Sequence, residues 1–195
     1  MSYRKRRLPH WAPDDAAIFL TWRLFESLPA PVPEWEHLPA GYQFEVTPKS
    51  SGPHYLSSPE VADAVAETML YGAEKLALYE LHAWVVMSNH VHMLIDPKAS
   101  LSRINHAVKT FSAREANSIL NRKGLTFWAN ESYDHWVRSL REFENIIRYI
   151  EFNPVCAGLV ANPEEWRWSS AKAGQEARLT EIRGDVGRGE GDVTQ

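Results

Sequence analysis

The chain has 195 residues, of which 44% are hydrophobic, and its formal net charge is −4, which predicts one globular domain and argues against a protein that coats nucleic acid nonspecifically. Its single cysteine, Cys156, excludes an internal disulfide and a multi-cysteine zinc site, so a metal ion would be bound by His, Asn, Asp or Glu. No apolar run is long enough to span a bilayer or to act as a signal peptide, so the sequence predicts a cytoplasmic protein that does not enter a membrane.

The N-terminal third of the chain has three predicted parts. Residues 1–16 form a basic arm, whose first ten residues carry four positive charges and no negative one. Ala17–Phe25 is rich in aromatic and β-branched residues, which predicts a strand and opens a domain that spans residues 17–172. The segment 27–59 contains seven prolines, too many for a central strand or a long helix, so it is predicted to be a surface excursion.

A helix is predicted from Pro59 to Tyr71. Ser58 can cap its first turn, and proline is favoured at the first helical position. Gly72 is the predicted stop.

The next stretch is predicted to be a β-hairpin. Leu76–Met87 and His90–Asp96 are apolar runs with strand character, and Ser88-Asn89 is a tight connection between them. Alternation along the second strand places His90 and His92 on one face, with Val91 on the other.

Three further elements follow. Ser100 can cap a helix that runs to about Leu120. The aromatic-rich segment Phe127–Arg138 contains a short predicted strand at Tyr133–Arg138, and its aromatic side chains suit either base stacking or packing under a loop. The stretch 140–153 has helical apolar spacing and is predicted to end before Pro154. Residues 173–195 are polar and rich in glycine, which predicts a disordered tail.

The two strand histidines are a candidate metal site. Their Cβ atoms would lie roughly 7 Å apart, close enough for both rings to bind one ion. Histidines with this spacing are also common as packed structural residues, so the pair alone decides nothing.

Tyr149 and Asn153 are four residues apart in the last predicted helix and therefore lie on one face. They could be a nucleophile beside a metal ligand at a helix C-terminus, where free carbonyls favour a cation. A surface tyrosine and a capping asparagine fit the same spacing.

Two motifs resemble those of the REP-associated tyrosine transposases, the single-tyrosine branch of the HUH nucleases. They are Ala83–Leu94 (AWVVMSNHVHML) and Phe143–Val160 (FENIIRYIEFNPVCAGLV). This resemblance implies an α+β fold with an antiparallel sheet of four to five strands and helices packed on it, similar to the ferredoxin or RRM arrangement. It also implies that Tyr149 is the catalytic nucleophile and that His90, His92 and Asn153 bind the metal.

The resemblance implies an enzyme that uses Mg²⁺ or Mn²⁺ to cleave and rejoin single-stranded DNA at hairpin repeats, through a 5′-phosphotyrosine intermediate, as a monomer or homodimer. Two alternatives stay open at this point: a non-catalytic regulatory protein that binds DNA hairpins, and a metal-dependent phosphoesterase of small molecules. The predicted DNA-binding residues are basic or aromatic: Arg4, Lys5, Arg6, Arg7, Arg103, Lys109, Arg114, Trp136 and Arg138.

Overall fold

The computed structural model describes residues 16–27 and 51–171. Its helices and strands are, in chain order, β1 (Ile18–Arg23), α1 (Pro59–Glu74), β2 (Tyr79–Val86), β3 (His90–Pro97), α2 (Leu101–Ile119), β4 (Tyr133–Trp136) and α3 (Leu140–Cys156), with short 3₁₀ turns at Tyr55–Ser57 and Pro163–Glu165. The predicted α+β class is therefore confirmed, with four strands in the sheet.

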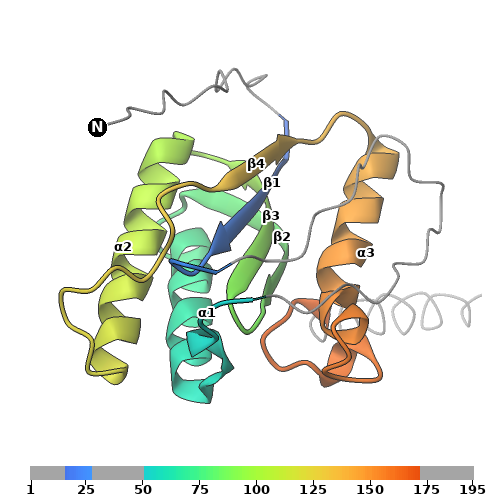
Figure 1. The fold of residues 1–195 in the computed structure, drawn as a ribbon. Helices are drawn as coiled ribbons and strands as arrows, with labels where there is room; N and C mark the ends of the chain where they lie inside the picture. The colour runs from blue at the N-terminus through green and yellow to red at the C-terminus, as the bar shows by residue number, and fades with distance from the viewer. Residues whose placement is uncertain (1–15, 28–50, 172–195) are drawn as a thin grey trace, which may run out of the picture.

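The sheet has the order β2-β3-β1-β4, and every neighbouring pair of strands is antiparallel (Figure 1). Together with α1 and α2, the strands give the succession β-α-β-β-α-β, in which β1 and β3 are central and β2 and β4 are the edges. This is the split βαβ arrangement of ferredoxin-like domains. The helix α3 is added after it.

The helices cover both faces of the sheet. The helices α1 and α2 share one core with Val91, Met93 and Ile95 of β3, while α3 packs on the other face, where Leu94 belongs to a second core. Figure 1 shows α3 separated from the other two helices by the sheet. The predicted alternation along the histidine strand is confirmed, because consecutive residues alternate between the two cores.

The predicted stop at Gly72 is wrong, since α1 continues to Glu74. Gly72 lies inside the helix because Tyr79 packs over it: a Cβ on Gly72 would lie 2.6 Å from the Tyr79 hydroxyl oxygen. That hydroxyl donates to the Met69 carbonyl at 2.6 Å. Ser58 precedes the helix as predicted, but its hydroxyl donates to Glu60 and makes no cap.

Two strands are shorter than predicted. The strand β2 begins at Tyr79, because Ala77 has a φ of 48° and turns the chain before the strand. The strand β4 ends at Trp136, and the backbone N–H of Arg138 bonds a side chain instead of the sheet. The predicted cap of α2 is confirmed, since the Ser100 hydroxyl accepts from the backbone N–H of Arg103.

The last helix runs past its predicted end and includes Pro154. The proline lies in the final turn, where its missing N–H removes a single helical hydrogen bond. The helix stops at Cys156, and Gly158 then takes a φ of 68°, the left-handed conformation that closes many helices. Asn153 therefore lies inside the last turn.

The aromatic segment before β4 is packed rather than exposed. Phe127 and Trp128 are buried in the core beneath α1 and α2, and the Trp128 ring nitrogen donates to Ser112 of α2 at 3.0 Å. The predicted arm, the middle of the proline-rich excursion and the predicted tail lie outside the described residues. Within the described part of the chain, no helix is both long and apolar enough to cross a membrane.

Candidate active site

His90 and His92 lie on the face of the sheet that α3 covers. Their exposed fractions are 6% and 1%, and their ring centroids are 4.7 Å apart. Two neighbouring imidazoles that have no carboxylate partner among the described residues can both bind one metal ion.

Each histidine is held through its Nδ1 atom. Asn89 Oδ1 lies 2.8 Å from His90 Nδ1, and because an amide oxygen only accepts, the histidine donates and its Nε2 keeps a lone pair when the ring is neutral. Thr21 Oγ1 lies 2.8 Å from His92 Nδ1. His92 Nε2 is buried and has no hydrogen-bond partner. Orientation of a metal-binding imidazole by a hydrogen bond at its other nitrogen is the usual arrangement in metal sites.

Burial keeps both rings neutral. Desolvation lowers the pKa of His90 to about 4, and desolvation together with the neighbouring His90 holds the pKa of His92 well below its usual value. A neutral imidazole is the form that binds metal ions. The unpaired Nε2 of His92 and the orientation of both rings therefore fit a divalent cation.

Tyr149 of α3 faces this pair. Its ring centroid is 5.3 Å from that of His92, and both rings contact Phe19 of β1. Tyr149 is 6% exposed, and burial raises its pKa to about 12, while a hydrogen bond from the Asn153 side chain acts in the opposite direction. The phenol is therefore protonated in the free protein.

Asn153 lies one turn after Tyr149 and is half-buried. Its carbonyl accepts from the backbone N–H of Ala157, so the prediction of a free carbonyl at this position is wrong. What remains is the side chain. The Asn153 side chain contacts Tyr149 through a hydrogen bond that lowers the pKa of the phenol, and an amide oxygen is a ligand type that divalent cations accept.

The donor set bears on which ion fits. Among the described residues, no group of three or more His, Cys, Asp or Glu side chains could hold a metal, so the predicted site has two imidazoles and the Asn153 amide as its protein donors. Mg²⁺ strongly prefers oxygen ligands, whereas nitrogen donors are better tolerated by the later divalent ions. Of the two predicted ions, Mn²⁺ fits two imidazoles and one amide better.

The predicted DNA-binding residues are spread over both faces. Arg103, Lys109 and Arg114 belong to α2, on the face away from the histidines, and two of them are engaged: Lys109 donates to the Ala129 carbonyl and Arg114 pairs with Glu115. Trp136 packs against the core beneath α1 and α2.

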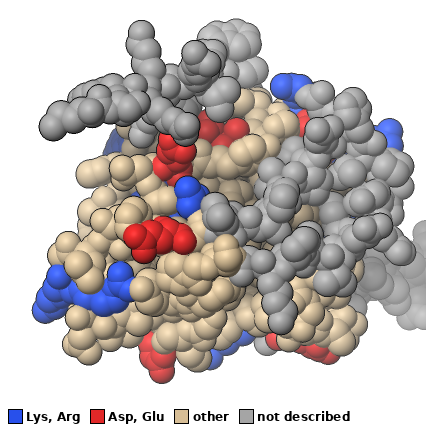
Figure 2. All heavy atoms as spheres, in the orientation of Figure 1, with Lys and Arg blue, Asp and Glu red and all other residues tan. Residues whose placement is uncertain are grey.

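Arg138 lies in the loop between β4 and α3, and its backbone N–H donates to the Glu142 carboxylate. Residues 4–7 lie outside the described part. Figure 2 shows small, separate groups of basic and acidic side chains among uncharged residues, so the described residues visible on this face form no continuous basic surface.

Three residues that support the site escaped the sequence analysis. Thr21 and Asn89 orient the two histidines, and Phe19 packs against both His92 and Tyr149. The role of Asn89 could have been inferred from the sequence, because it directly precedes His90. It was assigned only to the turn. The roles of Thr21 and Phe19 could not have been inferred in this way, since their proximity depends on the pairing of β1 with β3.

Comparison with known proteins supports the resemblance. The family model described as "Transposase IS200 like" matches residues 54–153, just over half of the chain. No curated protein sequence gives a match.

Matches among solved structures include the following two, of which the first shares the fold. One is a REP-associated tyrosine transposase bound to a REP hairpin, with a TM-score of 0.53 and 18% identity over 100% of this chain and 94% of that chain. The other is a putative transposase from Deinococcus radiodurans R1, with a TM-score of 0.42 and 19% identity over 75% of this chain and 96% of that one. On the strength of the family match, the chain belongs to the family of IS200-like transposases.

Proposed function

We propose that the protein is a metal-dependent transposase of the REP-associated group, which cleaves and rejoins single-stranded DNA through Tyr149. The observation that carries this proposal is the contact of Tyr149 with His92, whose buried Nε2 is unpaired and whose ring lies beside that of His90. An unmade buried hydrogen bond costs about 1–3 kcal/mol, and a bound cation would supply the partner that this nitrogen lacks.

His90, His92 and Asn153 would hold the cation, Mn²⁺ or Mg²⁺. When bound, the ion polarises the phosphate and stabilises the charge that develops on its oxygens. The histidines supply neutral nitrogen ligands, and Thr21 and Asn89 keep both rings in the required orientation.

The chemical step is attack of the Tyr149 hydroxyl oxygen on a DNA phosphorus. A new O–P bond forms, the bond from phosphorus to the 3′-oxygen breaks, the phenol proton leaves, and the departing 3′-oxygen takes up a proton. The 5′-phosphotyrosine retains the energy of the phosphodiester, so the reverse attack by a 3′-OH rejoins DNA without another energy source. The hydrogen bond from Asn153 helps because it favours the phenolate.

The proposed substrate is single-stranded DNA at a hairpin repeat. The structure with the same fold is that of a transposase bound to a REP hairpin, and in the proposed reaction a splayed strand would have to reach the seam between α3 and the sheet, where Tyr149 and His92 meet. One tyrosine cleaves one strand at a time, so complete transposition requires two protomers or two successive cleavages.

The test is trapping of a covalent protein–DNA adduct. Purified protein is incubated with a single-stranded hairpin oligonucleotide and Mn²⁺, then denatured and resolved on a gel. Tyr149→Phe is expected to abolish the adduct and to retain DNA binding, whereas Tyr71→Phe, an exposed tyrosine of α1, is the matched control and should react normally.

The histidines are tested in the same assay. Alanine at His90 or at His92 should abolish adduct formation, and alanine at His106, an exposed histidine of α2, should not. Adduct formation by Tyr149→Phe would refute the assignment of the nucleophile. Binding of hairpin DNA by the wild-type protein with no adduct in Mn²⁺ would favour the non-catalytic, regulatory alternative.

A further inference from the structure

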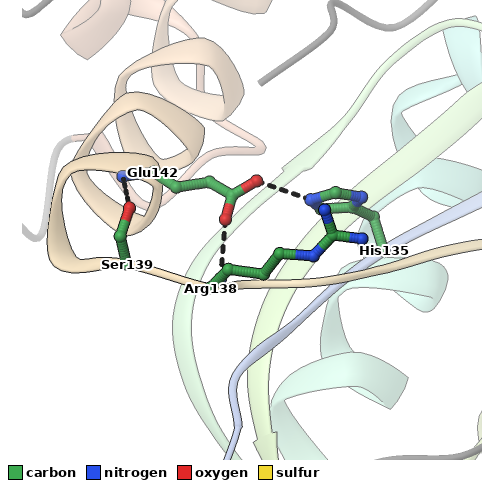
Figure 3. A network of polar contacts seen from close by, with 4 residues as sticks. All are labelled: His135, Arg138, Ser139 and Glu142. Carbon is green, nitrogen blue, oxygen red and sulfur yellow. Dashed lines mark hydrogen bonds and ion pairs between the residues drawn. The ribbon is translucent and has the colours of Figure 1, made fainter. Parts of the chain in front are cut away.

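Glu142 is a buried carboxylate at the start of α3, 4% exposed. One of its oxygens accepts from the His135 ring nitrogen Nε2 at 2.7 Å, and the other accepts from the backbone N–H of Arg138 at 2.6 Å. Its own backbone N–H donates to the Ser139 hydroxyl that caps the helix. Figure 3 shows these contacts together at the first turn. A buried carboxylate is tolerated only with partners of this kind, and both oxygens have one.

The contact with His135 joins two elements. His135 belongs to β4 and pairs in register with Phe19 of β1, so its place in the sheet is fixed by backbone hydrogen bonds. Glu142 lies seven residues before Tyr149, which is two helical turns or about 10.5 Å along the same face. The Glu142–His135 pair therefore connects the helix that carries Tyr149 to the strand layer beneath it.

Several other contacts of this helix consist of apolar or ring packing. Ile146 and Ile150 pack in the core under α3, and Phe143 meets the edge of the His82 ring at 5.1 Å. Apolar packing is non-directional and tolerates small rotations and shifts, whereas hydrogen bonds weaken steeply with angle. The Glu142 carboxylate bonds His135 of β4 and the backbone N–H of Arg138 in the preceding loop, and these directional contacts restrict the rotation and axial shift of this end of the helix.

A row of aromatic rings links this pair to the histidines. His135 stacks on Tyr133, with ring planes 3° apart, Tyr133 meets the edge of Phe19, and Phe19 stacks on His92. The pair and the candidate metal site therefore lie on one face of the sheet and contact one set of packed rings. Because Glu142 and Tyr149 belong to the same helix, a shift of α3 at Glu142 also moves Tyr149.

From this geometry we infer that Glu142 and His135 are positioning residues, which hold α3 so that the Tyr149 hydroxyl is aligned for attack. This inference rests on the proposed role of Tyr149. Neither residue touches the reacting atoms, so both act through the helix. Misplacement of a reacting group by about 1 Å can slow a reaction by roughly 100-fold.

The experiment measures the single-turnover rate of adduct formation at saturating hairpin DNA with Mn²⁺, together with DNA affinity in chelator. His135→Leu, which removes the donor, should slow adduct formation by about 10- to 100-fold while the dissociation constant for DNA changes less than about twofold. His135→Gln should restore most of the rate, because its side-chain amide can donate to Glu142 from nearly the same position.

The matched control is Asp63→Ala on α1. It removes the acceptor of Arg167 and of the Trp168 ring nitrogen on the far face of the sheet, so it lowers stability without touching α3. All rates are measured well below the melting temperature of each variant.

A wild-type rate in His135→Leu would overturn the inference. An equal slowing in Asp63→Ala would also overturn it, because the effect would then be general destabilisation. Failure of the proposed function is seen separately, as adduct formation by Tyr149→Phe.

Discussion

Thr21→Val removes one hydrogen bond and little else. Valine has nearly the shape of threonine and is equally suited to a strand, so packing in β1 is retained. The lost contact is the one at 2.8 Å between the hydroxyl and His92 Nδ1. Since His92 Nε2 already lacks a partner, the variant leaves both nitrogens of a buried ring unpaired.

Loss of this contact should lower both the free energy of unfolding and the affinity for the metal ion. An unsatisfied buried polar group costs about 1–3 kcal/mol, so the free energy of unfolding of the metal-free protein should fall by that amount. Removal of a group that orients a metal ligand typically lowers metal affinity by about 10- to 100-fold, which corresponds to roughly 1.4–2.7 kcal/mol.

Urea unfolding in chelator measures the first effect, and calorimetric titration with Mn²⁺ measures the second. Thr21→Ser keeps the hydroxyl and should retain most of the affinity. If Thr21→Val binds Mn²⁺ as tightly as the wild-type protein, the hydroxyl does not orient a metal ligand, and the reasoning about His92 fails.

Further predictions concern His90 as a metal ligand, the packing of Gly72 in α1, and the stability of the fold at alkaline pH. Asn89→Ala should lower Mn²⁺ affinity by about 10-fold in the same titration, because it frees the His90 ring to rotate; unchanged affinity would exclude Asn89 as a support. Gly72→Ala should destabilise by about 1–3 kcal/mol in urea unfolding, although alanine normally stabilises a helix, since its Cβ would meet the Tyr79 hydroxyl at 2.6 Å; the loss should shrink when Tyr79→Phe is added. Burial raises the pKa of Tyr79 in the folded protein, so the unfolded chain ionises first, and stability should fall as the pH rises above about 10. That fall should be shallower in Tyr79→Phe. An identical slope in the variant would show that Tyr79 does not cause the pH dependence.

Local patterns predicted the elements well where a single rule decided the outcome. The alternation along His90–Pro97 gave the correct faces, and Ser100 gave the start of α2. The errors at Gly72 and Pro154 are of one type, since in both cases a local rule was overridden by the context of the residue. Both residues disfavour helices locally, but tertiary contacts or a position in the last turn made them acceptable.

The candidate site was only partly visible in the sequence. The spacing of His90 and His92, and of Tyr149 and Asn153, placed each pair on one face of its own element. That the two elements face each other depends on α3 packing on the side of the sheet away from α1 and α2, and periodicity carries no information on that choice. The contact of His135 with Glu142 was hidden for the same reason, because it joins a strand to a helix.

The helix α3 covers the very face of the sheet that holds the histidines, so His92 is 1% exposed and Tyr149 6%. In the proposed reaction, a phosphotyrosine formed here would be enclosed between helix and sheet, where bulk water has little access to phosphorus. Exclusion of water suppresses hydrolysis of reactive intermediates. The covalent intermediate would then persist until a DNA 3′-OH returns to it, and the same burial that makes the phenol hard to ionise would favour rejoining over mere cutting.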